Sequence, residues 1–149
     1  MAEILIVEDD DTIRELIRRI LAEESYKLVE ASSGVEALAL LGKRQFDLVL
    51  LDVMLGHSSG FDVLKEADKK GLRSKSRVVM LTARNSERDF LQGWRSGVDQ
   101  YLTKPFDPDA LLKTVREILA RSPEELAERR RNELEKAELL YRLESAFKL

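Results

Sequence analysis

The feature that most constrains this chain is a repeated alternation of short strand-like runs with segments of helical periodicity. The runs span residues 4–7, 27–31, 48–51, 77–81 and 100–102. The run at 48–51 is apolar at every position, which is typical of a strand buried on both faces. Parallel strands need long crossover connections, and the helical segments between the runs supply them. The pattern therefore predicts an α/β fold with a doubly wound, five-stranded parallel sheet.

The ends of the expected helices are marked by capping residues and glycines. Helices are expected at about residues 13–21, 34–41, 61–70, 87–96 and 108–121. We expect Asp10 or Asp11 to cap the first helix and Gly42 to close the second. Asp107 is expected to cap the fifth helix, with Pro108 at its first position. These boundaries assign residues 1–121 to one domain.

The sequence changes character after Arg121. Ser122 to Glu125 forms a capping box with proline at the first helical position. Seven basic and seven acidic residues balance between Arg121 and Leu149, and no glycine follows Gly97. An apolar stripe is formed by Leu134, Ala137, Leu140, Tyr141 and Phe147. We expect a C-terminal amphipathic helix at residues 122–149, either solvated alone or used for dimerisation or signal relay.

The composition excludes several classes of protein. The net charge is −3, so the chain lacks the strong basic field of non-specific nucleic-acid binding. Without cysteine it has no disulfides and no thiolate metal site. It has no signal-like start, and no apolar run approaches the roughly 20 residues of a membrane span. We expect a cytoplasmic protein that does not enter a membrane. The single helix after residue 121 leaves no room for a helix-turn-helix domain, so DNA binding is not expected.

Polar residues follow the predicted strands where each strand ends. Glu8 and Asp9 follow the first strand, Asp52 the third, Thr82 the fourth and Lys104 the fifth. The carboxyl ends of parallel strands meet at one edge of the sheet, where such folds bind ligands. Three neighbouring carboxylates repel one another, and their oxygen ligands favour Mg²⁺ as the neutralising cation. With a lysine and a hydroxyl beside them, the set suits phosphoryl transfer with Asp52 as the nucleophile.

Four short motifs carry a resemblance to a known family. They are ILIVEDD at residues 4–10, LLDVM at 50–54, LTA at 81–83 and YLTKPF at 101–106. In this order and spacing they resemble the receiver domain of bacterial two-component response regulators, over about residues 2–121. The resemblance implies a flavodoxin-like sheet with strand order 2-1-3-4-5. It also implies a phosphorelay switch that only phosphorylates itself and slowly loses the phosphoryl group, without turnover of a substrate.

The resemblance also implies a role for each matching residue. Asp52 would accept a phosphoryl group from a sensor histidine kinase or a phosphotransfer protein. Mg²⁺ would be held by Asp9, Asp52, the backbone carbonyl of Met54 and, through water, Glu8. The phosphoryl group would be contacted by Lys104, which precedes a cis proline, by Thr82 and by the backbone of Ala83.

Two of the matching residues would form the switch. Thr82 would shift toward the phosphoryl group, and Tyr101 would turn inward into the vacated space. An ordinary core residue is the alternative interpretation of Tyr101, because an aromatic side chain in a short strand needs no further explanation. Trp94 on the predicted fourth helix has two interpretations as well, an anchor for a partner or a cover for its own domain.

The segment after Asp52 departs from the family pattern. Gly56 stands where a proline is common, and Ser59 replaces the aspartate of an aspartate-glycine pair, whereas Gly60 is kept. We expect residues 53–60 to form a loop that Gly56 makes less rigid, with its turn retained.

Two rival functions start from the same acidic residues. A Mg²⁺-dependent phosphatase that forms an aspartyl phosphate would place its nucleophile after the first strand, and Glu8, Asp10 and Thr12 imitate that spacing. Glutamate at the nucleophile position and Asp52 on the third strand argue against this rival. The second rival is a pseudo-receiver, an interaction module that is never phosphorylated.

Overall fold

A five-stranded parallel sheet forms the centre of the molecule. The computed structural model describes residues 1–73, 75–83 and 87–147, apart from the side chains of residues 87–89. The strands are β1 (Glu3–Val7), β2 (Lys27–Ala31), β3 (Leu48–Asp52), β6 (Arg77–Thr82) and β7 (Gln100–Thr103). Their order is β2-β1-β3-β6-β7, all parallel. Because β6 and β7 are the fourth and fifth predicted strands, the predicted order 2-1-3-4-5 is confirmed.

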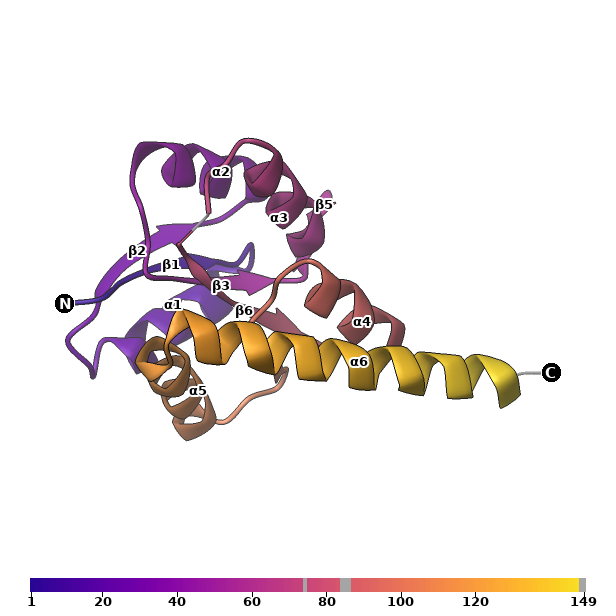
Figure 1. Ribbon diagram of the computed structural model, residues 1–149. Helices are drawn as coiled ribbons and strands as arrows, with labels where there is room; N and C mark the ends of the chain where they lie inside the picture. The colour runs from indigo at the N-terminus through magenta and orange to yellow at the C-terminus, as the bar shows by residue number, and fades with distance from the viewer. Residues whose placement is uncertain (74, 84–86, 148–149) are drawn as a thin grey trace.

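Helices cover both faces of this sheet (Figure 1). The helices of the domain are α1 (Asp11–Leu21), α2 (Gly34–Lys43), α3 (Gly60–Lys69), α4 (Glu87–Arg95) and α5 (Pro108–Ala120). One face packs against α1 and α5, and the other packs against α2 and α3. Every helix within the described ranges is too short or too polar to cross a lipid bilayer.

The strand side chains alternate between two apolar layers. On β1 and β3, Leu5 and Val49 point to the layer under α2 and α3, whereas Ile4 and Leu48 point to the layer under α1 and α5. This is the period of two that a strand imposes on its side chains. All five residues of β3 are buried, and each buried aliphatic side chain contributes about 1.5–3 kcal/mol to folding. The buried centre of the sheet therefore holds the strand ends in fixed positions.

The segment after Asp52 is more regular than the loop we expected. It contains an antiparallel hairpin of β4 (Met54–Leu55) and β5 (Ser58–Ser59). Gly56 lies in the connecting turn with φ +69°, a backbone conformation that favours glycine. Gly56 therefore has a defined conformational role in this turn. The hairpin has only two residues on each strand, which is too short for a periodic sequence signal.

The end of α2 differs from the prediction. The helix continues through Gly42 to Lys43, and Arg44 caps it with an extended backbone. The backbone N–H of Arg44 still donates to the carbonyl of Leu40, so the last turn is closed beyond the glycine. Gly42 is thus an interior helical residue, and the expectation that it closes the helix was wrong.

A long C-terminal helix, α6 (Pro123–Phe147), packs against α4 and runs along the domain (Figure 1). Its capping box is formed as expected. The backbone N–H of Glu125 donates to Oγ of Ser122 at 3.1 Å, and the N–H of Ser122 donates to the Glu125 carboxylate at 3.1 Å. The last turns project beyond the rest of the molecule. Residues 148 and 149 of the predicted helix lie outside the described residues.

Candidate functional site

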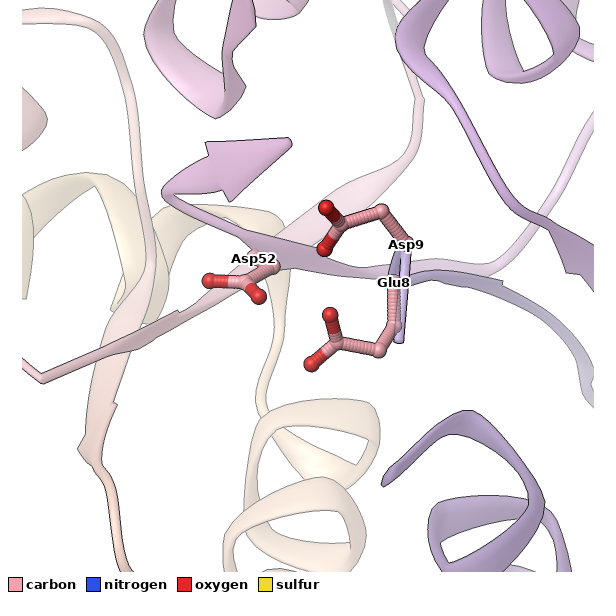
Figure 2. Close-up of side chains that lie close together, drawn as sticks. All are labelled: Glu8, Asp9 and Asp52. Carbon is pink, nitrogen blue, oxygen red and sulfur yellow. The ribbon is translucent and has the colours of Figure 1, made fainter. Parts of the chain in front are cut away.

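Three carboxylates meet at the carboxyl edge of the sheet. The strand register pairs Val7 of β1 with Leu51 of β3, so the residues that follow them, Glu8 and Asp52, reach the same level. Carboxylate oxygens of Glu8, Asp9 and Asp52 lie within 4.8 Å of one another. Figure 2 shows the side chains of Glu8 and Asp9 extending toward Asp52. The structure therefore brings together the three acids that the sequence singled out.

These acids differ in their access to solvent. Glu8 is 1% exposed and Asp52 4% exposed, whereas Asp9 is open to solvent. The backbone around them is fixed by hydrogen bonds: Arg14 Nη1 donates to the carbonyl of Glu8 at 2.8 Å. The N–H of Met54 donates to Asp52 Oδ1 at 3.1 Å. Glu8 and Asp52 are thus held in place, whereas Asp9 leaves the site accessible from solvent.

Lys104 lies between the two buried acids. Its Nζ is 2.7 Å from Glu8 Oε1 and 2.7 Å from Asp52 Oδ2. The backbone N–H of Lys104 donates to the carbonyl of Thr82 at 2.7 Å, and the Lys104–Pro105 peptide is cis as expected. Burial lowers the pKa of Lys104, but hydrogen bonds to Asp52 and Glu8 outweigh it and raise that pKa overall. Lys104 is therefore a fixed positive charge in the site.

One lysine does not balance three carboxylates. Burial, followed by the neighbouring Asp52, raises the pKa of Glu8 to about 7. This shift is the expected result of forcing like charges together in a site of low dielectric. An oxygen-only set with one acid open to solvent can accept a hard divalent cation, which would relieve the repulsion. The donor set therefore fits Mg²⁺.

The remaining residues predicted to contact the phosphoryl group or the metal lie at the ends of β6 and β3. Thr82 is the last residue of β6 and is buried, and Ala83 follows it in an exposed bend. Met54 begins β4 directly beyond the site, with an exposed side chain. All the residues predicted to act on the phosphoryl group or the metal therefore belong to one edge of the sheet.

Comparison with known proteins identifies the family. The family model described as "Response regulator receiver domain" matches residues 4–116. The chain belongs to this family. Its members act in phosphorylation-dependent signalling by two-component systems, so the fold and the class of function agree with the resemblance seen in the sequence.

Individual relatives support this assignment. Transcriptional regulatory protein SrrA of Staphylococcus aureus is 38% identical over 120 residues, covering 80% of this chain and 48% of SrrA. The chain thus spans about half the length of this curated relative. Chemotaxis protein CheY4 of Vibrio cholerae has a TM-score of 0.75 at 32% identity, covering 79% of this chain and 98% of CheY4. Response regulator protein TrrA of Thermotoga maritima, solved in complex with Mg(2+)-BeF, has a TM-score of 0.69 at 36% identity, covering 79% of this chain and 99% of TrrA.

Tyr101 of the receiver domain lies on β7 against α4. Its ring meets Phe90 edge-on at 4.9 Å between centroids and Trp94 edge-on at 5.6 Å. Trp94 is buried together with Ala137 of α6. Of the two interpretations of Trp94, the structure therefore supports a cover for its own chain.

Asp10 and Thr12 do not join the acidic site of the receiver domain. Asp10 caps α1, because its Oδ1 accepts a hydrogen bond from the N–H of Ile13 at 2.9 Å. Thr12 is exposed on the first turn of that helix. The phosphatase-like spacing of Glu8, Asp10 and Thr12 is thus explained by helix capping.

Gly60 has a role in the site that the sequence reasoning missed. A Cβ at this position would lie 2.5 Å from the carbonyl oxygen of Asp52 and 2.9 Å from Cε of Met80. The start of α3 can therefore approach the backbone of Asp52 only because residue 60 has no side chain. The retained glycine after Asp52 was the available signal, but we had connected it only with a turn.

Proposed function

We propose that this chain is a switch that accepts a phosphoryl group on Asp52 from a phosphohistidine of a sensor histidine kinase or phosphotransfer protein. The observation that carries the proposal is the buried Asp52 carboxylate, which forms an ion pair with Lys104 and lies beside the carboxylates of Glu8 and Asp9. Phosphoryl transfer depends mainly on positioning and on neutralising charge, and this arrangement provides both.

Mg²⁺ fits the proposed reaction. Asp9 and Asp52 would hold it directly, together with the backbone carbonyl of Met54, and Glu8 would hold it through water. When bound, the cation would neutralise charge on the carboxylates and on the phosphoryl oxygens. The openness of Asp9 to solvent supports this assignment, because the ion can reach it without a change in the fold.

The proposed transfer uses one oxygen of Asp52. This oxygen attacks phosphorus, the phosphorus–nitrogen bond of the donor breaks, and the histidine nitrogen keeps the electron pair. Lys104 offsets the charge of the phosphoryl group, and the Thr82 hydroxyl and the Ala83 N–H donate hydrogen bonds to its oxygens. Water later cleaves the acyl phosphate and restores the carboxylate, so the chain undergoes a slow cycle without turning over a separate substrate.

The proposed response to phosphorylation involves Thr82 and Tyr101. Thr82 would move toward the phosphoryl group, and Tyr101 would leave its position against α4 and turn inward. The two residues lie on the neighbouring strands β6 and β7, which supports their coupling. The surface formed by α4, β7 and α5 would have two conformations, and phosphorylation would shift the population from one to the other.

The proposed reaction takes place in the cytoplasm, where a histidine kinase obtains its phosphoryl group from ATP. We assign no DNA-binding role to residues 1–149. The segment after α5 supplies one helix whose acidic and basic residues balance, whereas a helix-turn-helix needs two packed helices.

Incubation with acetyl phosphate and Mg²⁺ tests the phosphorylation. We expect a mass increase of one phosphoryl group in the chain and no increase in Asp52→Asn, a variant of nearly the same size. An increase that persists in Asp52→Asn would refute the assignment of Asp52. No increase in either chain would favour the pseudo-receiver, and hydrolysis of a phosphomonoester at about 10 s⁻¹ or more would favour the phosphatase.

A second proposal is a homodimer through the C-terminal helix. The sequence analysis places the contact in residues 123–149. Exposed apolar side chains near the end of α6 support a contact through the last turns of this helix. They are Leu139, Leu140, Tyr141, Leu143 and Phe147. We expect light scattering to give a dimer for the full chain and a monomer for a chain ending at Arg121. An unchanged oligomeric state would remove α6 from the interface.

A further inference from the structure

The first half of α6 is attached to the domain by apolar contacts. Ala137 is buried with Leu91 and Trp94 of α4, and Phe90, Tyr101 and Leu134 pack against these three. We call these six residues the α4–α6 cluster. Leu134 and Ala137, two residues of the apolar stripe that the sequence predicts on this helix, therefore already pack within the chain.

A buried ion pair attaches the same helix at a second point. Asp99 is 3% exposed, its Oδ2 accepts a hydrogen bond from the Val78 N–H at 2.8 Å, and its Oδ1 pairs with Nη1 of Arg130. Arg129 Nη1 also donates to the carbonyl of Asp99 at 3.1 Å. If α6 left, the buried Asp99 carboxylate would lose its cation, which opposes release. Release therefore needs a change on the domain side of the interface.

Tyr101 is placed to provide that change. Among the described apolar residues, it alone belongs to the α4–α6 cluster and also packs against the apolar layer under α2 and α3. That layer includes Val53, which directly follows Asp52, and Met80, which pairs with Leu51 across β3 and β6. Tyr101 therefore joins the core beside Asp52 to the surface on which α6 rests.

The position of the Tyr101 ring depends on a glycine. Gly93 is buried on α4, and a Cβ at residue 93 would coincide with the Tyr101 hydroxyl. Beside the ring, a groove of about 220 Å³ opens between α4 and α6, lined in part by Phe90, Trp94, Lys136 and Tyr101. Moving the ring away would enlarge this groove and remove aromatic contacts beneath α6.

We propose that α6 is an intramolecular clamp whose docking is coupled to the position of Tyr101. The clamp covers the α4–β7 face, which consists of Phe90, Leu91 and Trp94 on α4 and Tyr101 on β7. With the ring between Phe90 and Trp94, α6 stays docked; displacement of the ring releases α6 and uncovers the face. The link to phosphorylation rests on the proposed function, in which Asp52 phosphorylation displaces Tyr101. Because coupling is reciprocal, a docked α6 then disfavours phosphorylation of Asp52.

Gly93→Ala in the full chain tests the clamp without phosphorylation. The new Cβ would force the Tyr101 ring out of its position, so we expect amide hydrogen exchange in residues 123–147 to rise about tenfold or more. Gly42→Ala is the matched control, because a Cβ at that helical glycine meets no atom within 4 Å. In the control, exchange in α6 should equal that of the wild-type chain.

Tyr101→Ala tests the same coupling by removing the ring instead of displacing it. We again expect faster exchange in α6, with the amides of β1 and β3 still protected. If one variant unfolds, its amides in β1 and β3 will lose protection from hydrogen exchange. The other variant then decides whether the docking of α6 depends on Tyr101. Wild-type exchange in α6 of a folded Gly93→Ala or Tyr101→Ala chain would overturn the clamp.

The phosphorylated full chain tests the link to Asp52. After treatment with acetyl phosphate and Mg²⁺, we expect the fraction with added phosphoryl mass to show faster exchange in α6. A phosphorylated fraction with unchanged α6 exchange would overturn this link. A chain that takes no phosphoryl group would contradict the proposed function, and the two variants above would still decide whether α6 responds to Tyr101.

Discussion

Single residues at the carboxyl edge of the sheet act through both charge and size. Lys104 bridges Glu8 and Asp52, two carboxylates with almost no exposure to water. Gly60 contributes by lacking a side chain, so that α3 begins against the backbone of Asp52. The site therefore depends on residues that need not touch a phosphoryl group as well as on those that would.

Lys104→Met tests the charge balance. The variant keeps an unbranched side chain but leaves two buried carboxylates without their cation, so we expect the free energy of unfolding to fall by about 1–3 kcal/mol. Mg²⁺ should stabilise this variant more than it stabilises the wild-type chain, because more charge is left to neutralise. Urea denaturation with and without Mg²⁺ measures both effects. Equal stabilisation of the two chains by Mg²⁺ would contradict this account.

Gly60→Ala tests the close approach of α3 to β3. The added Cβ meets the carbonyl oxygen of Asp52 and a side chain atom of Met80, so we expect a loss of stability of about 1–3 kcal/mol. Gly42→Ala is the control, since it adds the same atom inside a helix with open space around it. That variant should gain about 0.5–1 kcal/mol. Thermal unfolding compares them, and a neutral Gly60→Ala would show that the backbone can move apart.

At the scale of elements, the attachment of α6 to the domain is the main addition to the receiver fold. The capping box at Ser122 starts the helix, and the position of Arg130 two turns later brings it to the buried Asp99. An exposed ion pair adds little to stability, but a pair with one buried member is costly to break. The Arg130–Asp99 pair should therefore contribute more than the exposed pair of Arg95 with Glu138.

A double-mutant cycle measures this contribution. Arg130→Ala leaves the buried Asp99 charge without its partner, and since the arginine is about one-third exposed we expect a loss of about 1–3 kcal/mol. The same substitution made in an Asp99→Asn chain should cost clearly less, because no buried charge remains. Chemical denaturation of the four chains gives the coupling energy. A coupling near zero would show that the pair does not hold α6.

At the scale of the whole molecule, α6 packs on the domain and covers its α4–β7 face (Figure 1). Trp94 lies under this contact at 8% exposure, and it is the single tryptophan of the chain. Its fluorescence therefore reports directly on whether α6 is docked. The solved relatives CheY4 and TrrA are matched over nearly their full lengths by about four-fifths of this chain.

A chain ending at Arg121 tests this arrangement. We expect circular dichroism to show that α1 to α5 remain helical in this shorter chain. The emission of Trp94 should shift to longer wavelength, and its quenching by acrylamide should increase. The physical reason is the loss of Ala137 and Leu134, which shield the indole from water. Wild-type emission and quenching would show that α6 does not cover Trp94 in solution.

The sequence alone determined the order of strands and helices along the chain and the polar residues at the strand ends. These follow from short-range patterns, in which apolar periodicity identifies the strands and parallel pairing then places Glu8, Asp52 and Lys104 at one edge. The flavodoxin-like strand order came instead from the resemblance of four motifs to receiver domains. The prediction was wrong at Gly42 and missed the hairpin after Asp52, because both depend on the local backbone path and not on periodicity.

Only the tertiary structure decided where α6 lies and what it touches. The sequence predicts a helix at residues 122–149, but the docking of α6 on α4 depends on how Ala137 packs against Leu91 and Trp94. The pairing of Arg130 with Asp99 and the place left for Tyr101 by Gly93 are likewise contacts between separate elements. Such contacts depend on three-dimensional packing, which the spacing of residues along one segment does not contain.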